Sequence, residues 1–273
     1  MKDENGQVGV IGAILLIGVA LILVSYFVTY QIPDMVRNNE RSHTSEIVRV
    51  FSDIHEGLAS QIASMRVGTI YPVSFPIGSG SGSLFGFGGV SGTLSIGNEK
   101  FYVNSTSSLV ANSSIVYEAS FTQLIPQVYS YEMGGVILRQ GDRSLMKSDP
   151  IITVERDISK VTVNMTMVSL STMEISSRSG TMSSTINFFI DYVMPVNFGK
   201  EDQKTGNVIF DFHTPNAEAW RRHFEDILQT VGEEFYTFDE SLNTPGRFHM
   251  MLKNVDLENS TINYAIVRVS LGG

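Results

Sequence analysis

The residues best suited to chemistry lie in the last third of the chain, where acids and histidines follow one another closely. Asp211 and His213 are two positions apart, and on a β-strand this spacing puts both side chains on one face. With His223 they could bind a metal ion or activate water in an anchored hydrolase, provided that all three meet in one pocket. No H-E-x-x-H spacing is present. We therefore expect no metal site and no catalytic residues.

Other motifs for catalysis or cofactor binding are missing or incomplete. The chain has no cysteine, which excludes disulfides, thiolate zinc sites and a cysteine nucleophile. The glycine-rich run 78–92 lacks the Gly-Lys-[Ser/Thr] ending of a phosphate-binding loop, so it indicates a flexible connector or hairpin. The formal charge of −9 argues against a phosphate-binding surface. We expect a non-enzymatic protein without a cofactor and without a nucleic-acid partner.

The opening of the chain has a different character, because residues 5–33 contain no charged side chain. Residues 8–28 are almost wholly apolar, and as a helix rising about 1.5 Å per residue they match a hydrocarbon layer of about 30 Å. A secretory signal would have a basic start and a small-residue cleavage site, whereas here Lys2 is offset by Asp3 and Glu4. We therefore expect a retained helix that spans the membrane once.

The helical pattern continues past Pro33, which should end or kink the helix because it lacks an amide donor. Apolar side chains recur on one helical stripe, at Ile47, Phe51, Ile54, Leu58, Ile62 and Met65. Such a stripe packs either on a partner or on the chain's own later domain, and we expect the second.

Small residues within the apolar segment permit close contact between helices in lipid, where packing drives association. They are Gly9, Gly12, Ala13 and Gly18. Glycine weakens a helix, so its repeated use favours a contact that needs a close approach. A single-pass anchor can also carry such residues with no partner.

A short polar leader ends in Gly6, and residues 7–15 run directly into the apolar helix and its amphipathic extension. This arrangement resembles the N-terminus of archaeal type IV pilin-like proteins. The resemblance implies that a prepilin peptidase cuts between Gly6 and Gln7. It also implies that the helix first anchors the protein in the membrane and then packs against copies of itself or other pilin-like subunits in a filament. More weakly, residues 131–137 and 149–151 look like patterns in uncharacterised archaeal exported proteins with this N-terminus.

From about Gly68 the periodicity becomes alternating. The clearest case sets Val161, Val163, Met165 and Met167 on a core face, and Lys160, Thr162, Asn164 and Thr166 on a solvent face. Strands are predicted at 100–103, 109–120, 135–140, 151–155, 160–169, 185–192, 208–212, 234–238, 247–255 and 261–271. One short helix is predicted to begin at Thr214, its cap, and to end at Gly232.

The predicted fold class is therefore α+β, with a long N-terminal hydrophobic helix followed by a mainly antiparallel β-sandwich-like head that carries one short helix. Residues 1–6 are predicted to form a short leader, which is cleaved if the chain is processed as pilin-like proteins are. Residues 7–67 are predicted to form the transmembrane and assembly helix with its amphipathic extension, and residues 68–273 an extracellular head. Four sequons fit the glycosylation pattern of exported chains, at Asn104, Asn112, Asn164 and Asn259.

Two functions fit this sequence. The first is a pilin-like structural subunit of an extracellular filament or surface appendage, assembled through the N-terminal helix. The second is a single-pass membrane-anchored extracellular binding or adhesion module that does not polymerise.

Overall fold

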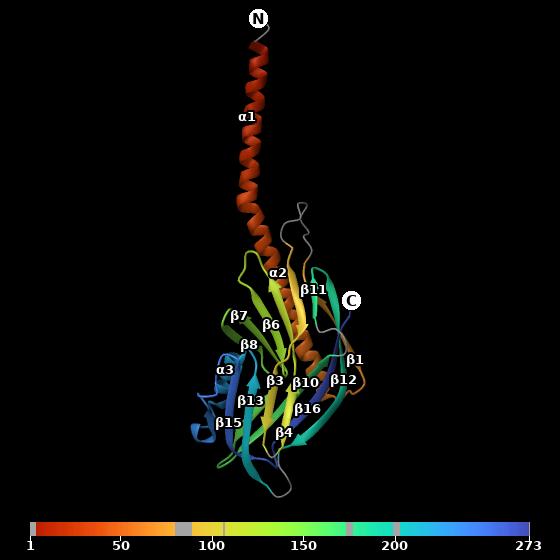
Figure 1. The fold of residues 1–273 in the computed structure, drawn as a ribbon, viewed down its shortest axis with the longest axis vertical. Coiled ribbons are helices and arrows are strands. Elements are labelled where there is room, and N and C mark those ends of the chain that lie inside the picture. The colour runs from red at the N-terminus through yellow and green to blue at the C-terminus, as the bar shows by residue number, and fades with distance from the viewer. Residues whose placement is uncertain (1–3, 80–88, 106, 173–176, 199–202, 273) are drawn as a thin grey trace.

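A computed structural model describes residues 4–79, 89–105, 107–172, 177–198 and 203–272, with side chains from Val10 onwards. The chain begins with one long rod of three helical parts (Figure 1): α1 (Glu4–Tyr26), the π-helix η1 (Phe27–Gln31) and α2 (Ile32–Ala63). Only the lower part of this rod lies against the head, and α1 projects beyond it. The expected hydrophobic helix is present, and it is followed by a head made mostly of strands.

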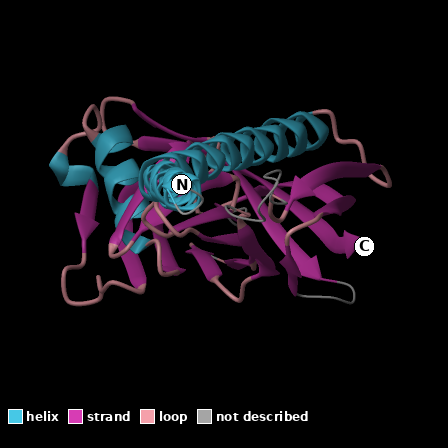
Figure 2. Ribbon diagram, turned by 90° about the horizontal axis from the view of Figure 1, so that it is seen from above, coloured by secondary structure: helices cyan, strands magenta, loops and turns pink. Residues whose placement is uncertain are grey.

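The helix changes direction near Pro33, as the sequence predicts. The Ile32 amide donates to the Phe27 carbonyl, five residues earlier, which is the hydrogen bond of a π-turn. Pro33 stands in the first turn of α2 and has no amide hydrogen to donate, so the wider turn comes where the regular pattern is interrupted. Figure 2 shows α1 nearly end-on while α2 runs away from it along the sheets.

The described strands of the head form two β-sheets. The larger follows the order β1 (Ile70–Pro76), β12 (Ser183–Asn197), β16 (Thr261–Gly272), β10 (Val161–Thr172), β15 (Arg247–Asp256), β13 (Thr205–His213), β3 (Lys100–Asn104) and β4 (Ser108–Asn112), with β14 (Tyr236–Phe238) on β15 and β9 (Ile152–Arg156) on β10. The smaller follows the order β11 (Ser177–Gly180), β2 (Ser91–Ile96), β5 (Ser114–Ser120), β6 (Gln127–Glu132), β7 (Gly135–Gln140) and β8 (Arg143–Ser148). Pairing among the described strands is antiparallel except where β10 meets β15 and β16. The α+β class is confirmed.

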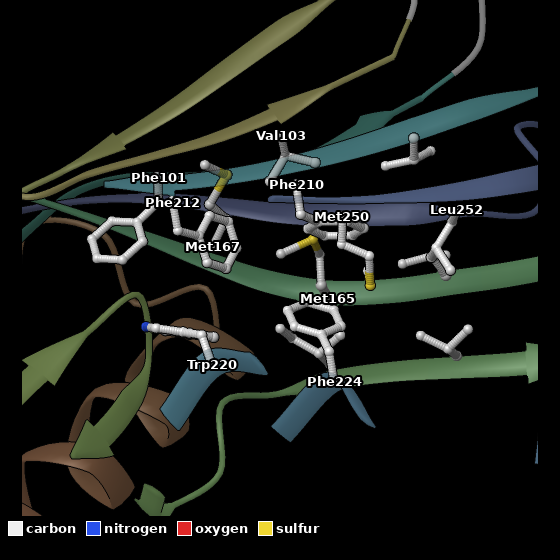
Figure 3. Packing of buried hydrophobic residues seen from close by; sticks show 14 of the residues in the cluster. Phe101, Val103, Met165, Met167, Phe210, Phe212, Trp220, Phe224, Met250 and Leu252 are labelled. Carbon is white, nitrogen blue, oxygen red and sulfur yellow. The ribbon is translucent and has the colours of Figure 1, made fainter. Parts of the chain in front are cut away.

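One core cluster forms where the short helix α3 (Ala217–Leu228) covers the inner face of the larger sheet. Trp220 and Phe224 of α3 pack against Phe212 of β13, and the Phe212 and Trp220 ring centroids are 4.9 Å apart. Met165 and Met167 of β10 belong to the same cluster (Figure 3). These two methionines face the core as their alternation predicts. A turn of 3-10 helix, η2 (Glu233–Phe235), follows α3.

The second core cluster joins α2 to both sheets. Phe51 is fully buried, and its ring meets Phe75 of β1 edge-on and stacks on Tyr129 of β6. Ile47, Ile54, Leu58 and Ile62 are buried in the same cluster. The predicted stripe is confirmed, and it packs on the chain's own head. Met65 is the exception, because α2 ends at Ala63 and leaves Met65 59% exposed.

Several local predictions were wrong for identifiable reasons. Residues 109–120 form two strands in different sheets, because Ser113 turns the chain with a φ of 68°. Thr166, expected on a solvent face, is buried, since the β6–β7 turn lies over it. Residues 234–235 belong to η2 and only 236–238 to a strand. The helix cap is Asn216 rather than Thr214, and α3 ends at Leu228, before Gly232.

Candidate functional site: the N-terminal helix and its seat on the head

From Val10 onwards the surface of α1 is apolar on all sides, and no other part of the described structure buries it. Every large hydrophobic side chain from Val10 to Val24 is more than half exposed, and Leu16 is 71% exposed. None of the most apolar stretch is buried. By length and composition this is a helix that could cross a membrane, and it is compatible with membrane anchoring.

Aromatic residues mark the end of the apolar stretch. The rings of Tyr26 and Tyr30 lie 5.3 Å apart, one helical turn from each other, and both are more than half exposed. The first charged side chains, Asp34 and Arg37, follow within the next two turns. Tyrosine is enriched where a membrane helix meets water, so this aromatic pair sits where the edge of a bilayer would lie.

The small residues of α1 have free space around them. A methyl group built on Gly12 or Gly18 meets no atom within 4 Å, and Ala13 is exposed. Nothing inside this chain therefore requires glycine at these positions. The side chain position of Gly9 lies outside the described residues, as do those of Gly6 and Gln7, whose backbone belongs to the start of α1. Helix packing and cleavage after Gly6 stay predictions.

A buried carboxylate fixes α2 to the head. Glu40 is 2% exposed and accepts hydrogen bonds from three consecutive backbone amides, those of Thr122, Gln123 and Leu124, in the loop between β5 and β6. The Leu124 contact is 2.8 Å long. Charged acceptors form the stronger class of hydrogen bond. Glu40 therefore holds this loop against the helix just below α1.

His43, one turn further on, forms a second buried attachment. The Tyr117 hydroxyl donates to the Ile77 carbonyl at 2.7 Å, so it must accept from Nε2 of His43 at 2.6 Å. Nδ1 of His43 is then unprotonated, and it is buried without a partner. Burial lowers the pKa of His43, against a smaller opposing effect of Glu46. His43 is neutral here and joins α2 to Tyr117 of β5, which in turn bonds to the chain just after β1.

The third buried polar cluster surrounds Glu132 of β6, which is fully buried. Its carboxylate accepts from Trp220 Nε1 at 2.9 Å, from the Thr214 hydroxyl at 3.0 Å and from the Asn216 amide. Burial raises the pKa of Glu132 to about 7, although these hydrogen bonds lower it in part. The Thr214 hydroxyl is therefore used by Glu132, and the cluster attaches the start of α3 to the smaller sheet.

The acid and histidine group suggested by the sequence is not brought together. Asp211 and His213 do share a face of β13, with His213 Nε2 at 3.4 Å from Asp211. Asp211 is, however, paired with Arg247 through two contacts of 2.7 Å. His223 is buried on α3 and contacts Asp149. The helix α3 packs against the face of β13 that carries Phe210 and Phe212, which is opposite to the face that carries Asp211 and His213.

No group of three or more potential metal ligands occurs among the residues that the structure describes. The glycine-rich run 78–92 falls largely outside these residues. Near its two ends, Ser79 and Val90 pair as an isolated β-bridge, so the run is a connection between β1 and β2 whose ends lie side by side.

The four sequons differ in their exposure. Asn112 and Asn259 are exposed, whereas Asn104 and Asn164 are half-buried. Asn164 does not stand on an open solvent face, because its side-chain oxygen accepts a hydrogen bond from Thr261 of the neighbouring strand at 2.9 Å. Glycosylation at all four positions stays a prediction, and the surface favours Asn112 and Asn259.

Sequence reasoning overlooked Glu40, His43 and Glu132. A signal existed for the first two, because Val36, Glu40, His43 and Ile47 continue the apolar stripe of α2 towards the N-terminus. A polar side chain on such a stripe is buried and must find partners. No comparable local signal exists for Glu132, whose partners lie more than 80 residues away in the chain.

Over the described residues, these features define a class of protein with one apolar N-terminal helix that is able to cross a membrane, and a β-rich head on which the continuation of that helix is packed. Within this class, the chain belongs to a family of unknown function, DUF7289, whose family model matches residues 88–245. The match covers more than half of the chain and lies entirely within the head, beginning just before β2. Comparisons with curated proteins and with solved structures gave no match.

Proposed function

We propose that this chain is a non-enzymatic, pilin-like structural subunit of an extracellular filament or surface appendage, assembled through α1. The observation that carries the proposal is an apolar helix that stands free of the head while its continuation, α2, is built into the core of that head. A filament subunit needs these two properties together. Its apolar helix must be available to other helices, and its head must move with that helix as one piece.

The exposed apolar surface of α1 supports this proposal. Side chains such as Leu15, Leu16 and Ile22 are each more than 60% exposed, and burying one of them is worth about 1.5–3 kcal/mol. A monomer in water could not keep a whole helix of this kind uncovered. Lipid would cover it before assembly, and the α1 helices of neighbouring subunits would cover it afterwards.

The proposed route follows the resemblance to archaeal pilin-like proteins. A prepilin peptidase would cut between Gly6 and Gln7 on the cytoplasmic side, while the head lies outside the cell. The exposed sequons Asn112 and Asn259 fit this orientation, because glycans are added to exported chains. The partners would then be the membrane, copies of this chain or other pilin-like subunits.

A second candidate is a single-pass membrane-anchored extracellular binding or adhesion module that does not polymerise. A cavity of about 830 Å³ on the head, lined by charged side chains, favours this alternative. It would use α1 as an anchor only, and the small residues of α1 would then have no partner.

Leucine at Gly12 and Gly18 separates the two functions. Because a larger side chain meets no atom of this chain at either position, the variants should fold normally. We expect the Gly12→Leu, Gly18→Leu double variant to be absent from the surface fraction sheared from cells, while it stays in the membrane. Leu16→Ile, a conservative change on the same helix, is the control and should assemble. Unchanged assembly of the double variant would contradict close packing of α1 helices.

A further inference from the structure

The loop between β5 and β6, residues 121–126, lies at the end of the head from which α1 projects (Figure 1). It carries three consecutive apolar residues. Leu124 is half-buried, whereas Pro126 is exposed and the side chain of Ile125 is 68% exposed. The loop therefore presents an apolar side chain to its surroundings beside the membrane-spanning part of the chain.

This loop is held in a fixed position by α2. The buried carboxylate of Glu40 accepts from the three backbone amides that directly precede Ile125 in the chain, and the contact with the Leu124 amide is 2.8 Å long. Hydrogen bonds to a charged acceptor are the stronger kind. A single exposed isoleucine is common on protein surfaces, but here its backbone is fixed against the helix that continues α1.

The head begins close to the edge of the bilayer. The aromatic pair Tyr26 and Tyr30 marks that edge, and Val36, only 8% exposed, is already covered by the head. At about 1.5 Å per residue, Val36 lies about 9 Å along the helix from Tyr30. The headgroup layer on each side of a bilayer is about 5–8 Å thick. No spacer therefore separates the head from the lipid headgroups.

The end of the head that carries this loop faces the bilayer. Figure 2 is viewed nearly along α1, and it shows the head extending to both sides of that helix. A bilayer that surrounds α1 would therefore lie over this end of the head. The β5–β6 loop lies at this end, next to the first turns of α2.

The sequence of the loop suits lipid better than a charged partner. Residues 119–131 contain no Asp, Glu, Lys, Arg or His, in a chain that has 28 acidic and 19 basic residues. Charged side chains here would have to lose water on approaching the apolar layer, which costs free energy. The uncharged loop avoids this cost and places an apolar side chain at the same end.

We propose that the β5–β6 loop is a second membrane contact, which inserts Ile125 into the interfacial layer of the bilayer beside α1. The lipid around α1 is the partner, because it is already at the level of the loop. The helix bends at η1, so α1 alone does not fix the angle between the head and the bilayer. A second contact fixes this angle. The inference rests on the proposed membrane span of α1 and is independent of filament assembly.

Quenching of tryptophan fluorescence by brominated lipid tests this contact in the full-length protein. Trp220 is the only tryptophan of the chain and is fully buried, so the wild type gives a constant background. The Ile125→Trp variant is placed in nanodiscs that hold one chain each, with bromine on the acyl carbons next to the headgroup. We expect the emission of the added tryptophan to be partly lost and shifted to shorter wavelength.

Ile70→Trp is the matched control. Ile70 is 59% exposed and begins β1, just beyond the far end of α2, which lies about 50 Å along the helix from Tyr30. Its added tryptophan should not be quenched. Equal quenching at the two positions, or none at position 125, would overturn the contact. A chain that does not enter the nanodisc would instead contradict the membrane span itself.

Glu40→Gln, made in the Ile125→Trp protein, tests how the loop is positioned. Glutamine keeps the size of the side chain, but it replaces one acceptor oxygen by a donor group that cannot bind the loop amides. We expect weaker quenching at position 125, while Glu46→Gln, at an exposed position on the same helix, should leave it unchanged. Full quenching in the Glu40→Gln variant would contradict positioning of the loop by Glu40.

Discussion

Glu40 shows how a single charged residue can join two parts of this molecule. It lies on the buried stripe of a helix, where an apolar side chain is the usual choice, and it serves as acceptor for three successive backbone amides. These amides belong to a loop without ladder partners of its own. Burying the carboxylate is tolerated because each of its oxygens is paired.

Replacement of Glu40 by alanine leaves the three loop amides without their acceptor. We expect Glu40→Ala to lower the free energy of unfolding by about 2 kcal/mol, the usual contribution of a hydrogen bond to a charged group. Glu46→Ala, at an exposed position on the same helix, should change it by less than about 0.5 kcal/mol. Denaturant unfolding of both variants measures the difference, and equal effects would show that Glu40 has no anchoring role.

Glu132 makes the folding stability of the head depend on pH. Its pKa is raised by burial from the ordinary 4.5 to about 7. Between these values the folded protein keeps the proton while the unfolded chain has lost it, so stability falls as the pH rises. The expected loss is on the order of 3 kcal/mol across that interval.

The Glu132→Gln variant removes this titration. Its stability should be lower overall, because an amide group offers Trp220 and Asn216 one acceptor in place of two. The difference between wild type and variant should shrink as the pH rises from 5 to 7. His43, whose pKa is lowered, acts in the opposite direction in both proteins and cancels in the comparison. A difference that is constant with pH would contradict a raised pKa at Glu132.

At the scale of elements, α2 belongs energetically to the head while α1 does not. Five apolar side chains of α2 are buried against the head, and their burial contributes about 10 kcal/mol to the free energy of unfolding. They are Ile47, Phe51, Ile54, Leu58 and Ile62. That value is comparable to the whole stability of an ordinary domain. The head should therefore not stay folded without α2.

Two truncations test this division. A chain that begins at Ile32 should be soluble and should unfold cooperatively, because it loses only side chains that the head does not bury. A chain that begins at Ser64 should aggregate or lack a cooperative transition. Circular dichroism during heating distinguishes the two, and a stable head without α2 would contradict the packing described above.

The sequence predicts the elements with strong local patterns and misses those that depend on distant partners. The stripe of α2 and the alternation of β10 identify their core faces. β1 is missed because Pro72 and Pro76 argue against a strand, and they are tolerated because β1 lies at the edge of its sheet. β6 is missed because Ser130 and Glu132 look exposed but are paired with α3.

The candidate site is predictable to different degrees. The apolar run of α1 is evident from composition alone, and the structure adds that this helix stands free of the head. The arginine-lined cavity could not be predicted, since Arg139, Arg221 and Arg247 come together only when both sheets and α3 are in place. The spacing of residues along the sequence does not show which arginines from distant elements lie close together in the fold.

At the scale of the whole molecule, the chain is an amphiphile with one exposed apolar helix, α1, and one acidic head. The apolar helix α1 requires lipid or other helices around it, and the head carries the cavity, which no residue of α2 lines. Anchoring and assembly would thus use the same part of the protein, α1. Arg143→Gln, on the head, should therefore leave assembly unchanged.

The most direct test of the proposed filament subunit is intact mass with N-terminal sequencing of the protein, purified from its native envelope and from sheared surface material. We expect a chain that begins at Gln7 and is recovered in the sheared fraction, with added mass if the sequons carry glycans. A chain that begins at Met1 or Lys2 and stays with the membrane would contradict prepilin processing and assembly, and would favour the anchored binding module.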